Sequence, residues 1–259
     1  MFFEKLVEEF KKLDEVEALA LGGSRTTDNY DEKSDYDLYV YVNKIPDLSK
    51  RNIVLEKCCK YIELNNSYRE LEDDCVLKDD IDIDILYRNL NDFSKSIAMV
   101  VDDGVAFNGY TTCMWHNLKT CKILFDRNGK LTLLKKRYEV KYPSKLKQNI
   151  ISKNMHLLSG FLPSYDRQIE KALARLDFVS VNHRLAAFLE SYFDVIFAIN
   201  ELTHPGEKRV LKYALKECKI LPNDYEKNLN LLLSSAFSDS SLFLNTLHKV
   251  IEELQIIVK

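Results

Sequence analysis

The sequence predicts an α+β protein in which a small mixed β-sheet with flanking helices is followed by an α-helical bundle. Two runs in the first half, residues 35–42 and 81–87, alternate hydrophobic and polar residues with period two, which is typical of strands with one buried face. Beyond residue 144 the strand signal ends, and hydrophobic residues recur three and four positions apart, as in amphipathic helices. We therefore expect two domains, residues 1–141 and 142–259.

The N-terminal half contains alternating helical and strand patterns. Ser49 is a suitable N-cap residue because its hydroxyl can accept a hydrogen bond from the first free N–H groups of a helix. In chain order we expect a helix from Phe3 ending near Leu13, strands at 17–21 and 35–42, a helix from Ser49 to Leu64, a hairpin of 68–78 and 81–87, a helix at 91–102 and a strand at 121–125.

The C-terminal half has the periodicity of a helical bundle. Breaks at residues 160–163, 204–206, 222–223 and 238–240 divide it into about five helices. Its most hydrophobic stretch, residues 185–199, is interrupted by Glu190 and Asp194, so we expect a core helix rather than a membrane span.

The overall composition limits the classes of partner. A formal net charge of −3 argues against general DNA binding, which needs a strong basic excess. The first residues become charged and amphipathic at once, so we expect no signal peptide, no membrane partner and a cytoplasmic protein. The cysteines show no Cys-x-x-Cys spacing and are expected to be reduced thiols: Cys58, Cys59, Cys75, Cys113, Cys121 and Cys218.

The most informative motif is the turn Gly22-Gly23-Ser24, followed by an acidic pair. Asp35 and Asp37 share one face of the strand at 35–42, where two carboxylates can hold a hard divalent cation with oxygen ligands. The turn lacks large side chains, so its backbone N–H groups can approach a phosphate.

A second acidic strand follows at residues 81–88. Alternation puts its isoleucines on one face and both Asp82 and Asp84 on the other, so period alone does not choose between the two aspartates. Asp84 lies deeper in the hydrophobic run, and we choose it as the third carboxylate.

The glycine turn, the acidic pair and a third acid on a later strand resemble the nucleotidyltransferase superfamily, which includes DNA polymerase beta and the antibiotic adenylyltransferases. The sequence looks most like a small bacterial branch of that superfamily, whose substrates are largely unknown. Segments that carry this likeness are residues 84–88, 115–118, 125–129, Asn200 and 204–209.

The resemblance implies an N-terminal nucleotidyltransferase domain with two Mg²⁺ ions, or Mn²⁺, bound by Asp35, Asp37 and Asp84. Asp84 would also accept the proton of the acceptor hydroxyl. A nucleoside triphosphate would be held by Gly22, Gly23, Ser24, Arg25 and Lys208. The implied reaction moves a nucleoside monophosphate, most simply AMP, to a hydroxyl of a small molecule and releases pyrophosphate.

Two other functions stay open at this stage. A toxin-type transferase would modify an RNA end, such as that of tRNA, or a protein side chain. A degenerate member would bind nucleotide without catalysis, although the presence of all three acids disfavours it. The sequence does not identify the acceptor.

Several further residues have an ordinary structural interpretation. Trp115 and His116 can line an acceptor pocket, but we favour core packing. Lys208 and Arg209 are as consistent with surface charge as with triphosphate binding. A basic cluster could hold the triphosphate or an RNA end, but we favour a solvated surface for it. It comprises Lys135, Lys136, Arg137, Lys141, Lys145, Lys147 and Lys153.

Overall fold

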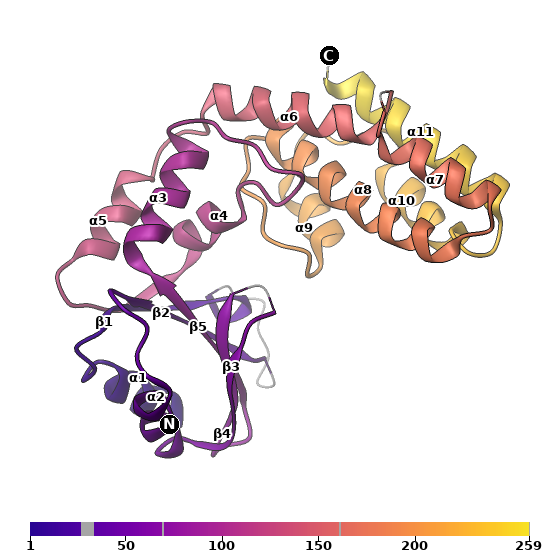
Figure 1. The fold of residues 1–259 in the computed structure, drawn as a ribbon. Helices are drawn as coiled ribbons and strands as arrows, with labels where there is room; N and C mark the ends of the chain where they lie inside the picture. The colour runs from indigo at the N-terminus through magenta and orange to yellow at the C-terminus, as the bar shows by residue number, and fades with distance from the viewer. Residues whose placement is uncertain (27–33, 69, 161, 259) are drawn as a thin grey trace. The chain divides into compact units, whose positions relative to one another are not determined.

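The computed structural model describes residues 1–26, 34–68, 70–160 and 162–258, and within them one mixed β-sheet has the strand order β3-β4-β5-β2-β1-β6 (Figure 1). Strands β2 and β5 are parallel, and the other neighbouring pairs are antiparallel. The strands are β1 Val16–Gly22, β2 Tyr36–Val42, β3 Cys59–Asn66, β4 Leu71–Leu77, β5 Asp82–Asn89 and β6 Lys122–Asp126.

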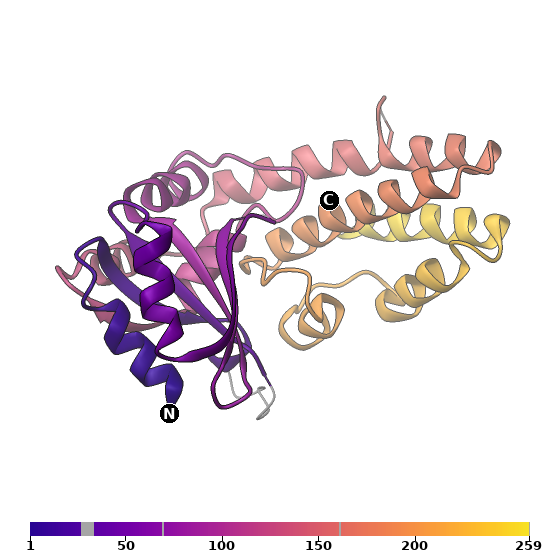
Figure 2. The same ribbon diagram turned by 60° about the horizontal axis from the view of Figure 1, so that its bottom comes forward.

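Helices α1 (Phe2–Phe10) and α2 (Leu48–Glu56) cover one face of this sheet, and they lie in front of it in Figure 2. α1 buries Phe3, Leu6 and Phe10 in the core on that side, as its helical spacing predicts. The other face is covered at one end by α3 (Leu90–Val101), whose Phe93 packs on Tyr41 with ring centroids 5.2 Å apart.

The two faces of the sheet follow from the alternation in β2. Tyr36, Leu38 and Val40 enter the core beneath α1 and α2. Asp37 and Tyr39 therefore point to the opposite face. The end of that face away from α3 carries the acidic residues.

The chain divides into two compact units. Unit 1 comprises Met1–Ala98 and Asn117–Val140, and unit 2 comprises Met99–His116 and Lys141–Lys259. Residues Met99–His116 group with the C-terminal unit although they precede the junction expected at 141. Two further helices flank β6 in the sequence, α4 (Cys113–Thr120) before it and α5 (Lys130–Arg137) after it.

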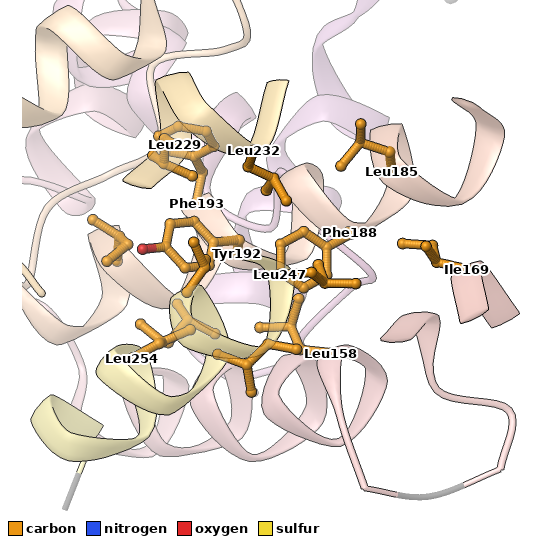
Figure 3. Close-up of a cluster of buried hydrophobic side chains, with 14 of the residues drawn as sticks. Leu158, Ile169, Leu185, Phe188, Tyr192, Phe193, Leu229, Leu232, Leu247 and Leu254 are labelled. Carbon is orange, nitrogen blue, oxygen red and sulfur yellow. The ribbon is translucent and has the colours of Figure 1, made fainter. Parts of the chain in front are cut away.

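Unit 2 is built around the long helix α8, which contacts α6, α7 and α9. Phe188, Tyr192 and Phe193 of α8 point toward leucines of neighbouring helices in a buried cluster (Figure 3). The C-terminal helices are α6 Ser144–Leu158, α7 Tyr165–Ala174, α8 Phe178–Ile199, α9 Val210–Glu217, α10 Tyr225–Ser235 and α11 Ser240–Val258. The predicted α+β class, with a mixed sheet followed by helices, is confirmed.

The expected helix from Ser49 to Leu64 is wrong in its second half, and its N-cap residue is Asp47 rather than Ser49. α2 ends at Glu56, and Cys59–Asn66 forms strand β3, which pairs with β4. Ile62 and Leu64 are half-buried while Tyr61 and Glu63 are exposed, so the segment has the period of a strand. Pairing with β4 gives its backbone N–H and C=O groups partners that a longer helix would have supplied internally.

The helical half also has one more break than the sequence indicated. α7 and α8 are separated at Leu176, whose φ of 57° is left-handed, and Asp177 caps α8 by accepting a hydrogen bond from the Ser180 N–H at 3.0 Å. No helix among the described residues is long and hydrophobic enough to cross a membrane.

Candidate functional site

A row of residues crosses the sheet at the level of Asp37. Asp37 of β2 is the register partner of Asp84 on the adjacent parallel strand β5. On its other side, Asp37 is opposite Gly22, the last residue of β1. Since neighbouring strands lie about 4.8 Å apart, the predicted glycine turn and two of the predicted carboxylates form one continuous row.

The same register separates Asp84 from Asp82. Pairing between β2 and β5 begins at Tyr36 and Ile83, one position after Asp82, which is exposed and opposite Val76 of β4. Asp84 is half-buried. Asp35 immediately precedes β2 and is half-buried as well. The structure thus puts Asp84, rather than Asp82, beside Asp37.

Both glycines of the turn leave space for side chains of β2. A Cβ atom at Gly22 would lie 2.3 Å from Cζ of Tyr39, and one at Gly23 would lie 1.7 Å from Oδ2 of Asp37. Gly23 also has a φ of 61°, which side chains rarely adopt. The bare backbone of the turn therefore lies directly against the Asp37 carboxylate.

The turn is closed by a short 3₁₀ helix, η1 (Ser24–Thr26). The N–H and the hydroxyl of Thr26 donate to the Gly23 carbonyl oxygen at 3.2 and 2.8 Å. Of Ser24 only the backbone is described. The guanidinium of Arg25 donates to the carbonyl oxygens of Ser34 and Asp35, at 2.7 and 3.2 Å from Nε.

The acidic row continues beyond Asp84 toward the edge of the sheet. Asp74 of β4 is opposite Asp84, and Glu63 of β3 is opposite Asp74. Asn66 donates an amide hydrogen bond to Asp74 at 2.5 Å. Burial, with the carboxylates of Asp74 and Glu70 nearby, raises the pKa of Glu72. This face therefore carries negative charge well beyond the predicted triad.

Tyr39 and Arg88, which were not among the predicted site residues, lie on the same face as the row, further along β2 and β5. Tyr39 is buried beside Gly22, and the Arg88 guanidinium lies 4.0 Å from the centre of its ring. Arg88 makes a bidentate ion pair with Glu70, with N···O distances of 2.6 and 2.8 Å. Arg88 lies at the end of a predicted strand, but its ion-pair partner Glu70 lies 18 residues earlier in the sequence. No local pattern therefore predicts this ion pair.

The residues of the row have the chemistry that a hard divalent cation requires. Within the described parts of the chain, no cluster of three or more His, Cys, Asp or Glu side chains is arranged to hold a metal ion. Mg²⁺ is commonly bound through one or two carboxylates together with substrate phosphates. The opposed carboxylates of Asp37 and Asp84, beside a turn without side chains, fit that kind of site.

The remaining predicted residues belong to unit 2. Trp115 is buried and packs on Tyr142 with ring centroids 5.5 Å apart, in agreement with core packing. His116 Nδ1 lies 2.8 Å from the Thr203 hydroxyl. Lys208 is exposed in the segment before α9. Its assignment to the triphosphate stays a prediction.

The two sequence segments around His116 and His204 come together inside unit 2. The backbone N–H of His204 donates to the Thr112 hydroxyl at 2.8 Å, and Tyr110 donates to Glu207 at 3.3 Å. Burial, with the nearby His116, lowers the pKa of His204 to about 3. These segments thus form part of the helical core.

The basic cluster is divided between the two units. Lys135, Lys136 and Arg137 end α5 in unit 1, and Lys135 donates to the Cys121 carbonyl oxygen at 2.5 Å. Lys147 belongs to unit 2, where it pairs with Glu201 at 3.0 Å. Local partners of this kind agree with the interpretation of these cations as surface groups.

Comparison with known families gives matches to two parts of the chain. Residues 4–100 match the family model described as polymerase beta, nucleotidyltransferase. Residues 111–209 match a domain of unknown function, DUF4037. The match to the nucleotidyltransferase model lies in the N-terminal part of the chain, where the motifs predicted it.

Solved structures that are similar to the chain include the following two. One is a nucleotidyltransferase-like protein from Exiguobacterium sibiricum 255-15, with 14% identity over 98% of this chain and 72% of that one, and a TM-score of 0.46. The other is an aminoglycoside 6-adenyltransferase from Bacillus subtilis, with 10% identity over 98% of this chain and 89% of that one, and a TM-score of 0.31. Comparison with curated proteins gives no match.

Proposed function

We propose that this protein transfers a nucleoside monophosphate, AMP in the simplest case, from a nucleoside triphosphate to a hydroxyl group of a small-molecule acceptor. The observation that carries the proposal is the row in which Gly22, Asp37 and Asp84 are register partners on three adjacent strands. It puts the Gly22-Gly23-Ser24 turn, in which two residues lack side chains, next to two carboxylates, a combination that supports nucleotidyl transfer.

Asp35, Asp37 and Asp84 are the proposed metal ligands. Two Mg²⁺ ions, or Mn²⁺, would neutralise the triphosphate and stabilise the attacking and leaving oxygens of an in-line displacement. The close contact between Gly23 and the Asp37 carboxylate supports this, because an anion on the turn and a cation on Asp37 would be neighbours.

Asp84 has a second proposed role toward the acceptor. The acceptor hydroxyl must lose a proton as its oxygen bonds to the α-phosphorus, and the bond from that phosphorus to the oxygen bridging to the β-phosphate breaks. Asp84 accepts this proton, and pyrophosphate leaves. The backbone N–H groups of Gly22, Gly23 and Ser24 hold the departing phosphates.

The acidic side chains beyond Asp84 favour a cationic acceptor. Asp74 and Glu63 extend the row in register, and the neighbouring Glu72 has a raised pKa. An amine-bearing acceptor would be attracted to this end of the sheet, whereas an RNA phosphate backbone would be repelled. This charge supports the small-molecule reading over the transfer to an RNA end.

The test is a transfer assay with ATP labelled at the α-phosphate. The full-length protein is incubated with Mg²⁺ and either an amino-sugar alcohol, a neutral sugar of matched size, total tRNA or a protein extract. We expect label on the amino-sugar alcohol and much less on the neutral sugar. Label only on tRNA or protein would instead establish the toxin-type alternative, and nucleotide binding without any transfer would establish a degenerate member.

A further inference from the structure

The guanidinium of Arg25 donates hydrogen bonds to the backbone just before β2 begins. Its Nε donates to the Ser34 carbonyl oxygen at 2.7 Å and to the Asp35 carbonyl oxygen at 3.2 Å. Its Nη2 donates to the Ser34 carbonyl oxygen as well. One side chain from the glycine turn therefore satisfies two consecutive carbonyls that precede the strand.

A stack of rings holds the guanidinium in that position. Arg25 Cζ lies 3.9 Å from the centre of the Tyr36 ring. Tyr36 in turn stacks on Phe3 of α1, with ring centroids 4.1 Å apart and an interplanar angle of 6°. A planar guanidinium stacked on an aromatic ring keeps its donors in a fixed orientation.

This stack lies on the face of the sheet opposite to the acidic row. Tyr36 is 8% exposed and belongs to the core beneath α1, whereas Asp37, the next residue, points to the other side. Arg25 also lines a groove on the α1 side, together with Glu4, Glu8 and Lys122. Arg25 thus lies on the Tyr36 side of the entry to β2.

We propose that Arg25 is a positioning residue, which fixes the Ser34–Asp35 backbone so that the Asp35 carboxylate is held ready for metal beside Asp37. The inference rests on the proposed function, in which Asp35 and Asp37 share a divalent cation. Residues that orient metal ligands typically change metal affinity by roughly 10- to 100-fold when they are replaced.

A positioning role and a purely electrostatic role of Arg25 predict opposite changes in metal affinity when Arg25 is replaced. Removal of a positive charge near a cation site should strengthen metal binding, because a repulsion is lost. A positioning role predicts the opposite, since Asp35 would lose its fixed backbone. A direct phosphate ligand would weaken ATP binding and leave the binding of metal alone unchanged or tighter.

The experiment is titration of Mn²⁺ alone into the full-length protein, followed by electron paramagnetic resonance, for Arg25→Ala, Arg25→Lys, Lys122→Ala and Asp35→Asn. Lys122→Ala is the matched control, because it removes a cation from the same groove. Arg25→Lys keeps the positive charge but loses the paired hydrogen bonds to the Ser34 and Asp35 carbonyl oxygens. It is the variant measured if Arg25→Ala does not fold. Thermal unfolding checks each variant.

We expect Mn²⁺ affinity to fall roughly 10- to 100-fold in Arg25→Ala and severalfold in Arg25→Lys, with Lys122→Ala unchanged or slightly tighter. If Asp35→Asn loses Mn²⁺ while both Arg25 variants bind it normally, the positioning role is overturned and the proposed function stands. If Asp35→Asn binds Mn²⁺ like the wild type, the metal assignment itself fails, and the role of Arg25 fails with it.

Discussion

Asp37 of β2 and Asp84 of β5 lie opposite each other in adjacent parallel strands. Parallel strands that are neighbours in a sheet need not be neighbours in sequence, and here 46 residues separate the two carboxylates along the chain. The register brings them to one level, with Gly22 of β1 on the far side of Asp37.

Replacement of Asp84 should stop transfer, whereas replacement of Asp82 should be mild. Asp82 lies two residues earlier on β5, about 7 Å away along the strand, and is exposed. Label transfer and ATP-analogue binding are measured for Asp84→Ala and Asp82→Ala. Asp84→Ala should bind the triphosphate and not transfer it. Equal losses in both variants would contradict the assignment of Asp84.

Gly22→Ala should destabilise the protein through a collision with Tyr39. The new Cβ would lie 2.3 Å from the ring, and overpacking of this kind costs about 1–3 kcal/mol. Tyr39→Leu removes the distal ring atoms, so Gly22→Ala should cost less in that background, with a coupling of about 0.5–3 kcal/mol. Urea unfolding of the two single variants and the double variant measures it. If the two losses of unfolding free energy simply add in the double variant, the cost of Gly22→Ala does not come from a collision with Tyr39.

The buried ion pair between Arg51 of α2 and Asp73 of β4 should be important for stability. Its N···O distance is 2.6 Å, with the two side chains 2% and 0% exposed. Asp73→Ala leaves a buried cation without its partner, and should lower the free energy of unfolding by about 3–5 kcal/mol. The control, Asp92→Ala, breaks the exposed pair with Lys95 and should cost less than about 1 kcal/mol. Similar losses of unfolding free energy in the two variants would contradict the greater importance of the buried pair.

Two buried groups of unit 2 should give opposing pH dependences. Burial raises the pKa of Asp194 to about 7 from 3.8, although Thr111 and Asn154 donate hydrogen bonds to it. Burial lowers the pKa of His204 to about 3 from 6.5. Stability linked to Asp194 is therefore lost as pH rises from about 4 to 7, and stability linked to His204 is lost as pH falls from about 6.5 to 3.

Asp194→Asn should leave the loss of stability linked to His204 unopposed on acidification. Between pH 6.5 and 4, the free energy of unfolding of this variant should fall more steeply on acidification than that of the wild type. Urea unfolding at pH 7 and pH 5 measures the slopes. Parallel pH profiles for the wild type and Asp194→Asn would show that Asp194 stays ionised, held by its three hydrogen-bond donors.

The sequence predicted much of the row because its signals are local. Alternation identifies β2 and β5 and assigns Asp37 and Asp84 to one face of each strand. Helical spacing in α1 and α8 likewise marks their buried sides. These patterns depend on residues only a few positions apart, so a single sequence carries them.

What the sequence missed depends on contacts between distant segments. β3 looked like the end of a helix, because its partner β4 decides its conformation. The need for Gly22 depends on the Tyr39 ring, 17 residues later, and the direction of Arg25 depends on Tyr36 and Phe3. Such relationships follow from the register and packing of the folded sheet, and no local pattern encodes them.

The most direct test of the central claim is nucleotidyl transfer by Asp37→Asn, measured as pyrophosphate release with Mg²⁺ and the acceptor identified in the labelled-ATP assay. The substitution removes a carboxylate from the centre of the row but keeps its shape, so the variant should unfold at a temperature close to that of the wild type. We predict at least a thousandfold loss of rate, about 4 kcal/mol of transition-state stabilisation, with Asp82→Asn close to the wild type. A folded Asp37→Asn variant with wild-type transfer would contradict the proposed site.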